Sequence, residues 1–302
     1  MPMPKPLSAA DHAAVHDLAD AANSADGVRP LSERTLLDLD LLHESVRHLL
    51  VWQGGELAAY AQLGRERQGE LVVHPAHRRA GHGRNLLTNL AGQGAAAVWA
   101  HGDLPAARAL AASVGWEPVR ILRKLSRPLA EEDSAPVTIP EGYGIRGFVP
   151  GQDEADWLRI NALAFADHPE QGRVTRNDLD RLIAQDWFDP AGLLLLTDAS
   201  GAVIGSHWTK VDPAERAPAA DGSPVPAGEV YVVALDPAVH GRGLAAPLTA
   251  AGLAHLAARG LRSVVLYVDD DNTAALRTYR RLGFTDLEVH AQYAPVSAAR
   301  PA

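Results

Sequence analysis

The stretch Glu229-Val-Tyr-Val-Val-Ala-Leu-Asp-Pro237, followed by His240-Gly-Arg-Gly-Leu-Ala245, decides the fold of this chain. Its β-branched run ends at a Pro-marked turn and predicts a buried strand, and the Gly-rich turn with the apolar pattern after it predicts a helix. A second predicted strand, 264–268, leads to Asn272 and then to Tyr279, two helical turns further on. A strand, a Gly-rich turn and a helix N-terminus in this order are typical of a site for a phosphate-bearing cofactor.

The composition indicates a globular protein of two domains. The chain has 302 residues, of which 47% are hydrophobic and 22% are charged. No uncharged apolar run approaches the roughly 20 residues of a membrane helix, and the N-terminus has no apolar signal core, so we expect a cytoplasmic protein. A net charge of -9 gives no general reason to expect nucleic acid or an anionic membrane surface as a partner.

The chain contains no Cys. This excludes disulfides, thiolate metal sites and a Cys nucleophile. Coding bias is one explanation, since Lys occurs only at positions 5, 124 and 210. The other explanation is that a thiol-bearing substrate would form mixed disulfides with surface thiols.

Hydrophobic periodicity predicts the elements of the first half. They are a Ser-capped helix over 8–22, a second helix through about residue 42, a hairpin over 49–52 and 57–63, a strand at 71–73, a helix to about 93, a strand at 96–99, a helix over 105–114 and a strand over 119–125. A polar, Pro-containing segment follows and predicts a linker over 131–141, which separates a domain over 1–130 from one over 142–302.

The second half repeats this order. Its predicted elements are a strand over 143–149, helices over 153–165 and 177–183, a hairpin over 193–197 and 203–211, and a Pro-rich, irregular and mobile loop over 212–228 before the opening stretch. The segment 75–83 aligns without a gap with 237–245, and Gly115-Trp116 corresponds to Gly283-Phe284. We therefore predict a duplicated α/β (α+β) domain, each copy with a mixed, largely antiparallel sheet flanked by helices.

Both halves resemble the GCN5-related N-acetyltransferase (GNAT) superfamily, whose pattern Arg/Gln-x-x-Gly-x-Gly/Ala lies between a strand and a helix. Further stretches are similar to the tandem members that acetylate the cysteinyl amine of cysteinyl-glucosaminyl-inositol (desacetylmycothiol) with acetyl-CoA, the last step of mycothiol biosynthesis; these stretches are 165–172, 187–190, 207–210, 228–233 and 266–272. The resemblance implies a monomer without a metal, whose partner is a small-molecule thiol pseudo-disaccharide. The residues by themselves indicate only an acyl-CoA-type cofactor and an acceptor amine.

The predicted acetyl-CoA residues fall into two sets. Gly243 lets the backbone approach the pyrophosphate, the helix expected to begin near Gly241 offers free N–H groups, and Arg242 adds a charge-assisted contact. The resemblance adds the backbone of Val233–Leu235, which would pair with the pantetheine amides, and an N–H there that would face the thioester oxygen. The second-half set is Val233, Ala234, Leu235, His240, Gly241, Arg242, Gly243, Leu244, Ala245, Ala246, Asn272 and Arg277, and the first-half set is Leu71, Val72, Val73, Arg78, Arg79, Gly81, Gly83 and Arg84.

Two residues are predicted to be catalytic. The attacking amine must be neutral, so a base is needed, and Glu229 at the start of the central strand is the base that the resemblance implies. A lone Glu there is otherwise a solvated residue at a loop–strand junction. Tyr279 lies where many family members carry a Tyr that acts as a general acid towards the leaving thiolate, although a Tyr on an amphipathic helix is more often a core residue.

The resemblance also assigns an acceptor pocket to Glu170, Lys210 and Tyr267 of the second half, together with Glu33 of the first. Each has a structural alternative: a turn cap, a solvated strand-end charge, a core ring and a first-turn helix acid, respectively. A polar pocket suits an acceptor that carries an amine, a thiol and two polyhydroxylated rings.

The first half is predicted to bind acetyl-CoA without turnover. Alignment on the shared Pro places Arg67 opposite Glu229, and alignment on the terminal Gly places Ala111, or Leu110 in another register, opposite Tyr279. None of these side chains suits the catalytic role. Two other functions stay open: a tandem acetyltransferase for another amine, such as an aminoglycoside or a protein N-terminus, and an acetyl-CoA sensor without turnover.

Overall fold

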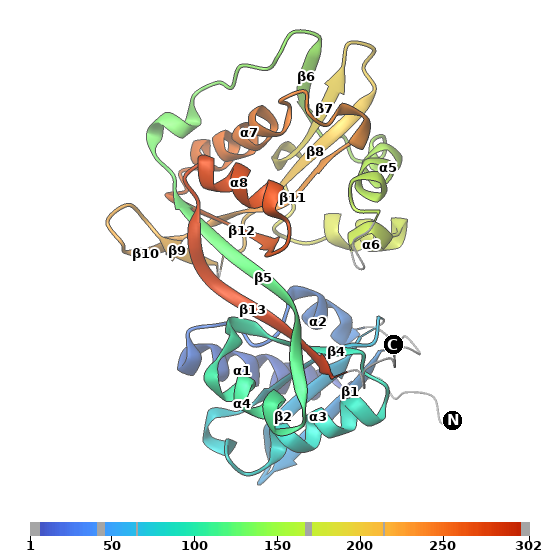
Figure 1. Cartoon of the computed structure of the whole chain (residues 1–302), viewed down its shortest axis with the longest axis vertical. Coiled ribbons are helices and arrows are strands. Elements are labelled where there is room, and N and C mark those ends of the chain that lie inside the picture. Colours follow the sequence, from blue (N-terminus) through green and yellow to red (C-terminus); the bar gives the residue numbers. More distant parts are fainter. Residues whose placement is uncertain (1–6, 41–45, 65, 167–170, 214, 297–302) are drawn as a thin grey trace, which may run out of the picture. The chain divides into compact units, whose positions relative to one another are not determined.

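The computed structural model describes residues 7–40, 46–64, 66–166, 171–213 and 215–296 (Figure 1). They form two compact units, the first drawn from Met1–Arg123, Asp269–Asp271 and Glu288–Ala302, the second from Lys124–Val268 and Asn272–Leu287. Neither unit is contiguous in sequence, because strands β5 (Trp116–Pro128) and β13 (Thr285–Pro295) contribute residues to both. The division into domains over 1–130 and 142–302 stays a prediction. None of the helices in the described ranges has the length and apolar character that crossing a bilayer requires.

The first unit contains a mixed sheet in the order β1-β2-β3-β4-β13-β5, in which β3 and β4 are parallel and the pairs β1–β2, β2–β3 and β4–β13 are antiparallel. Its elements are α1 (Ala9–Asp26), α2 (Glu33–Leu37), β1 (Arg47–Gln53), β2 (Glu56–Leu63), β3 (Gln68–Val73), α3 (His82–Gly92), β4 (Ala97–Ala100) and α4 (Pro105–Ser113). Short 3₁₀ turns η1 (Asp38–Asp40), η2 (Pro75–His77) and η3 (His101–Asp103) complete it.

Local signals explain the start of this unit. Ser8 caps α1 in a capping box with Asp11, as the Ser at that position predicted. Gly54 and Gly55 take left-handed φ angles of 61° and 89° in the turn between β1 and β2, where other residues would be strained. Helices α1 and α2 pack on one face of the sheet, and α3 and α4 pack on the other.

The second unit has the strand order β5-β12-β11-β8-β7-β6, with β11 and β12 parallel and β11–β8, β8–β7 and β7–β6 antiparallel. Its elements are β6 (Tyr143–Gly147), α5 (Glu154–Ala164), α6 (Arg176–Ile183), β7 (Leu193–Asp198), β8 (Val203–Lys210), β9 (Arg216–Pro218), β10 (Pro224–Pro226), β11 (Gly228–Leu235), α7 (Ala245–Ala258), β12 (Ser263–Asp269) and α8 (Thr273–Arg281). The 3₁₀ turns are η4 (Glu131–Ser134), η5 (Gln171–Arg173), η6 (Pro190–Gly192) and η7 (Pro237–Val239).

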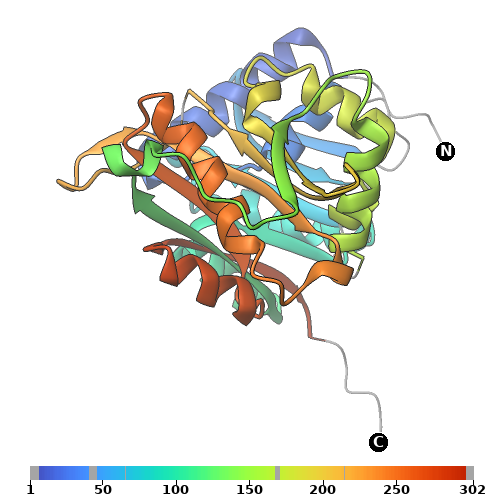
Figure 2. The same cartoon turned by 90° about the horizontal axis from the view of Figure 1, so that it is seen from above.

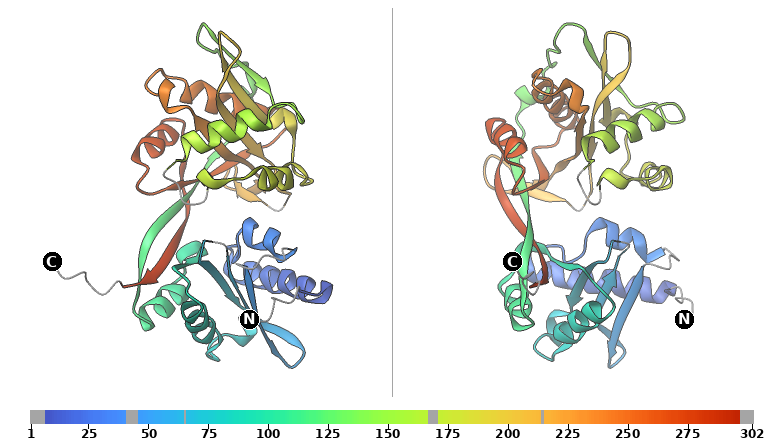
Figure 3. Two further views of the ribbon diagram at one scale, coloured as in Figure 1. Left: turned by 90° about the vertical axis from the view of Figure 1, so that its right-hand side faces the viewer. Right: turned by 45° about the vertical axis from the view of Figure 1, so that its right-hand side comes forward.

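Helices cover both faces of this second sheet. Helices α5 and α6 pack on β7, β8 and β11 through Trp157, Ile160 and Leu179, whereas α7 packs on the opposite face through Leu248 and Leu253. The yellow-green and orange helices can be followed on opposite sides of the strands in Figures 2 and 3. The predicted fold class, with its mixed and largely antiparallel sheets, is confirmed.

Two local predictions were wrong, and one strand was missed. The segment predicted as an irregular loop over 212–228 contains the antiparallel pair β9–β10, with Ala217 and Ala227 buried. Helix α7 begins at Ala245, not near Gly241. The last strand, β13, was not predicted at all.

A glycine inside α7 allows the helix to approach the sheet. A Cβ built on Gly252 would lie 1.9 Å from Cε1 of His207, a fully buried side chain whose Nδ1 is 3.0 Å from the Leu248 carbonyl oxygen. Replacing Gly252 by Ala should therefore lower the free energy of unfolding by about 2 kcal/mol, because overpacking outweighs the gain in helix propensity. Urea unfolding measures the change. Gly92→Ala in α3, where the new methyl group meets no atom within 4 Å, is the matched control, and equal midpoints for the two variants would contradict this packing argument.

Candidate active site

The turn between β11 and α7 has the geometry that its glycines predicted. Asp236 accepts a hydrogen bond from the Ala238 N–H, and Pro237 opens the 3₁₀ turn η7. Gly241 and Gly243 then take φ angles of 77° and 74°, in the left-handed region that favours glycine. No side chain caps α7. Its first N–H groups are therefore placed as the donors of an anion site, four residues later than predicted.

The corresponding turn of the first unit keeps the same backbone path. Arg79 and Gly81 take φ angles of 68° and 90°, at the positions of Gly241 and Gly243. An Arg with a left-handed φ angle costs roughly 1 kcal/mol of conformational free energy. This turn keeps the left-handed conformation in spite of that cost. Arg78 forms a bidentate pair with Asp26, at 2.8 and 2.7 Å, so its guanidinium already has a partner inside the unit.

In both units the parallel strands beside this turn diverge. The recorded β11–β12 pairs are Gly228 with Val264, Glu229 with Val265 and Val230 with Leu266. The next residues of β11 pair only with β8, on their other side. Strands β3 and β4 likewise pair over three residues and part after Glu70. The divergence leaves backbone groups of the predicted segments 233–235 and 71–73 directed towards the gap between strands, where an extended ligand can pair.

Glu229 lies beside this divergence, on β11. It is half-buried and is the Cα partner of Lys210 on β8 and of Val265 on β12. Because directly paired residues of an antiparallel ladder point to the same face, Glu229 and Lys210 are neighbours. Successive residues of a strand alternate, so Glu229 points to the face opposite that of Val230.

Tyr279 lies on α8, on the face of the β11–β12 pair that is opposite to the face of Glu229. Its ring packs in one cluster with Val230 and Leu266 and contacts Phe284 at a centroid distance of 5.8 Å. Burial raises the pKa of Tyr279 to about 12, so the phenol keeps its proton near neutral pH. Asn272 caps α8, since its Oδ1 accepts the Ala275 N–H at 3.1 Å. Because Oδ1 already accepts this hydrogen bond, the predicted contact of Asn272 with the pantetheine arm would be made by its amide NH₂ group.

The predicted acceptor residues are spread over the chain. Lys210 is 6% exposed, and its ammonium lies over the rings of Trp187 and Tyr231. Tyr267 is 39% exposed, with the Lys124 ammonium 5.7 Å from its ring centroid. Glu33 is the first residue of α2, in the first unit. Glu170 lies outside the described residues.

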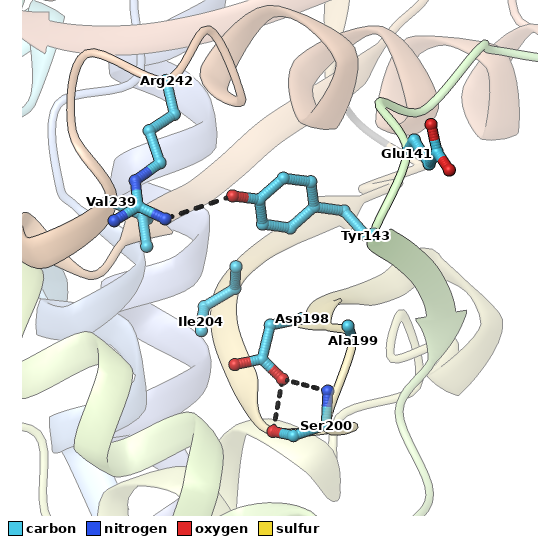
Figure 4. A pocket seen from close by; sticks show the side chains of 9 residues that line it. Glu141, Tyr143, Asp198, Ala199, Ser200, Ile204, Val239 and Arg242 are labelled. Atoms are coloured by element: carbon cyan, nitrogen blue, oxygen red, sulfur yellow. Dashed lines mark hydrogen bonds between the residues drawn. The ribbon is translucent and has the colours of Figure 1, made fainter.

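The predicted cofactor residue Arg242 faces a pocket on the β6–β7 side of the turn. Its Nη1 donates a hydrogen bond of 3.3 Å to the hydroxyl oxygen of Tyr143. Figure 4 marks this hydrogen bond with a dashed line. The pocket has a volume of about 410 Å³ and is also lined by Asp198, Ser200 and Ile204. Arg277 and Arg84 are exposed on α8 and α3.

The first unit carries a carboxylate that the ungapped alignment missed. Strand β11 has a bulge at Tyr231 that β3 lacks, so counting back from the shared Pro does not give equivalent positions. Glu70 lies at the end of the β3–β4 pairing, 6% exposed. Burial alone would raise the pKa of Glu70, but His101 at 3.3 Å and hydrogen bonds from Ser32 lower it. The carboxylate is thus held by internal contacts with Ser32 and His101.

One group in the described residues has the spacing of metal ligands. The ligand atoms of Glu56, His74 and His77 lie within 4.8 Å of one another. However, Nδ1 of His74 accepts the Ala76 N–H at 3.2 Å, which places the ring proton on Nε2, directed at Glu56. The Glu56 carboxylate contacts both rings, with Nε2 of His77 at 2.8 Å and Nε2 of His74 at 3.5 Å.

Sequence reasoning missed two side chains of this region, Trp187 and Tyr231. Both belong to stretches that carry the family resemblance, 187–190 and 228–233. Nothing in their local pattern distinguishes them from core aromatics. Their proximity to Lys210 is a property of the folded unit.

The chain matches known proteins over most of its length. The model of the acetyltransferase (GNAT) family matches residues 13–116 and 157–284, one match in each half. A mycothiol acetyltransferase of Thermobispora bispora is 51% identical over 94% of this chain and 95% of its own, and one of Thermomonospora curvata is 50% identical over 91% of each chain.

Solved structures give the same fold. A GCN5-related N-acetyltransferase from Sphaerobacter thermophilus has a TM-score of 0.65 at 26% identity, covering 96% of this chain and 93% of that one. A tandem GNAT protein from the clavulanic acid biosynthesis pathway has a TM-score of 0.70 at 16% identity, covering 96% and 95%, and it supports the fold alone. With its duplicated turn and diverging strands, the chain belongs to the acetyltransferase (GNAT) family, as an acetyl-transferring enzyme grouped with the mycothiol acetyltransferases.

Proposed function

We propose that the second unit transfers the acetyl group of acetyl-CoA to the cysteinyl amine of cysteinyl-glucosaminyl-inositol. The observation that carries this proposal is the pair of groups flanking the last β11–β12 pair. Glu229 and Lys210 lie on one face of the sheet, and Tyr279 packs with Val230 and Leu266 on the other. A thioester between the diverging strands thus has a base on one side and a phenol on the other.

Each group has a distinct chemical task. Glu229 accepts a proton from the cysteinyl amine as its nitrogen forms a bond to the thioester carbonyl carbon. Backbone N–H groups of Val233–Leu235 stabilise the charge that develops on the carbonyl oxygen. When the carbon–sulfur bond breaks, Tyr279 donates a hydrogen bond to the leaving thiolate. A phenol with a pKa of about 12 keeps its proton beside a thiolate whose conjugate acid has a pKa of roughly 8.5, so stabilisation is favoured over complete transfer.

The residues present suit acetyl-CoA. The N–H groups at the start of α7 and the left-handed Gly241 and Gly243 suit a pyrophosphate. Acetyl-CoA supplies the activated acetyl group, and the chain supplies orientation and proton transfer. The same proposal includes a small-molecule thiol pseudo-disaccharide as the acceptor and a cytoplasmic location. It rests on the names of the relatives and on the polar residue Lys210.

The acceptor is tested by the release of free CoA. Purified protein is mixed with acetyl-CoA in three parallel reactions. The acceptor is cysteinyl-glucosaminyl-inositol in the first, an aminoglycoside in the second and a peptide with a free N-terminus in the third. CoA is separated by chromatography, because the proposed acceptor carries a thiol that would react with thiol reagents. Release with the pseudo-disaccharide supports the proposal. Release only with the aminoglycoside or the peptide would favour an enzyme for another amine, and no release at all would favour a sensor.

We also propose that the first unit binds acetyl-CoA without turnover, which predicts two binding sites of unequal function. Arg84→Glu places a negative charge in the first turn of α3 and should reduce the binding stoichiometry measured by calorimetry from about two to about one. Ala246→Glu, nine residues after the shared Pro like Arg84, is the matched change in the second unit. Gly83 is a poorer choice, because its Cβ would lie 3.3 Å from Leu110. A stoichiometry of one in the unmodified protein would contradict this proposal.

A further inference from the structure

Lys210 has an unusual environment for a lysine at the end of a strand. It is 6% exposed, and its Nζ lies 4.8 Å from the ring centroid of Trp187 and 5.3 Å from that of Tyr231. The two rings contact each other at 5.3 Å with an interplanar angle of 66°. An ammonium over aromatic faces interacts with the negative charge of the ring faces, and this attraction is strongest where water is excluded.

The two rings are held in place by the core. Trp187 contacts Trp208 at a centroid distance of 5.8 Å, and Tyr231 contacts it at 5.5 Å with an interplanar angle of 87°. Trp208 is fully buried on β8. The orientation of both rings is therefore set by packing that continues into the core formed with α5 and α6.

The β-bulge places one of these rings. Val230 pairs with Thr209 and Val232 with Trp208, so Tyr231 is the extra residue of β11. Glu229, two residues before it, is paired directly with Lys210. The bulge thus brings an aromatic ring and a carboxylate of the same strand to the side chain of Lys210.

We propose that Trp187 and Tyr231 are positioning residues that hold the Lys210 ammonium beside Glu229, where it binds a hydroxyl-rich acceptor. This inference rests on the proposed function for the identity of the acceptor. A free lysine loses substantial side-chain entropy when it binds a ligand. Lys210 has already lost part of that freedom through its contacts with the two rings.

A role in packing alone makes a different prediction. If the rings only fill the core, any smaller side chain at 187 should destabilise the unit and leave the kinetic constants of the folded protein unchanged. Phe188 provides the matched comparison. It packs in the same core against Trp208 and Phe148, whereas the Lys210 ammonium lies over Trp187 and Tyr231.

The position of Lys210 is tested without any substrate. Because the chain has Lys only at positions 5, 124 and 210, labelling with ¹³C-lysine gives three side-chain signals, and Lys210→Met assigns one of them. The ε-CH₂ protons of Lys210 should be shifted upfield by the two rings. Trp187→Leu should move this signal towards its free value, whereas Phe188→Leu should leave it. An unshifted Lys210 signal in the unmodified protein would overturn the proposed placement.

The consequence for the acceptor is tested by steady-state kinetics with cysteinyl-glucosaminyl-inositol. Trp187→Leu should raise the KM for this acceptor roughly 10-fold with the KM for acetyl-CoA unchanged, and Trp187→Phe, which keeps a π face, should restore most of the loss. In the Lys210→Met background, Trp187→Leu should have no further effect, because the two side chains act as one unit. Additive effects would mean that the ring acts independently of Lys210 and would overturn the positioning role. If the unmodified protein acetylates no such acceptor, the proposed function fails, and the NMR signals still decide where Lys210 is held.

Discussion

Replacing Glu229 by Gln is expected to lower turnover roughly 100-fold or more, the loss typical of a missing general base. Gln keeps the size of the side chain and its place opposite Lys210 in the β8–β11 ladder. It removes only the group that accepts the proton. The loss should be greatest at low pH, because an α-amino group with a pKa of roughly 8 is then mostly protonated and must lose a proton before it attacks.

Initial rates across about pH 6 to 9 measure this effect, with acetyl-CoA saturating. Glu132→Gln is the matched control, since it makes the same chemical change at an exposed residue of the second unit. Circular dichroism establishes that both variants are folded. A Glu229→Gln enzyme as fast as the unmodified protein at every pH would remove Glu229 from the role of base.

Replacing Tyr279 by Phe should lower kcat roughly 10- to 100-fold, which is the size of a hydrogen bond to a charged group. The ring stays in its cluster against Phe284, so stability should change little. Burial raises the pKa of Tyr279 to about 12, and a phenol with a raised pKa is protonated throughout the range below that value. The factor lost should therefore be the same at each pH from about 7 to 10.

The pH profile of this second variant separates the two roles. Single-turnover rates for the unmodified enzyme and Tyr279→Phe should give parallel curves, in contrast to the pH-dependent loss expected for Glu229→Gln. A loss that disappears above about pH 9 would show that Tyr279 ionises in the working range, against its raised pKa.

The local turns and caps could be predicted from the sequence because each depends on a single residue type. Gly241 and Gly243 occupy left-handed φ angles that few other residues adopt, and Ser8 caps α1 with its own hydroxyl group. The tandem organisation followed from the ungapped alignment of 75–83 with 237–245 and from the repeated order of the flanking elements. Such signals act over a few residues and do not require knowledge of the folded sheet.

Long-range pairing could not be predicted in this way. Strand β13 pairs with β4 through Ala291 and Ala100, residues far apart in sequence, and its alternating pattern begins after the last residues that the two halves share. The β9–β10 pair contains Pro218, Pro224 and Pro226, and Pro normally argues against a strand. In β13 and in the β9–β10 pair, the strand that serves as the pairing partner determines the structure. The local sequence pattern does not show which strand that is.

The candidate site shows the same division. Glu229 and Tyr279 were selected by resemblance, and the structure adds that Glu229 lies on one face of the β11–β12 pair while Tyr279 belongs to the hydrophobic cluster on the other face. Trp187 was not selected, because an aromatic residue near the core gives the same local pattern whether or not a lysine lies over it. The bulge at Tyr231, which shifts the count between the two halves, also has no signal in the sequence.

The most direct test of the account is the structure of the product formed from cysteinyl-glucosaminyl-inositol and acetyl-CoA. The account predicts a product in which the cysteinyl nitrogen carries the acetyl group and the thiol stays free, with one equivalent of CoA released, and in which formation depends on Glu229. NMR of the isolated product, together with its reaction with a thiol reagent, distinguishes the nitrogen from the sulfur as the site of acetylation. An S-acetylated product, or equal formation of the N-acetylated product by Glu229→Gln, would contradict it.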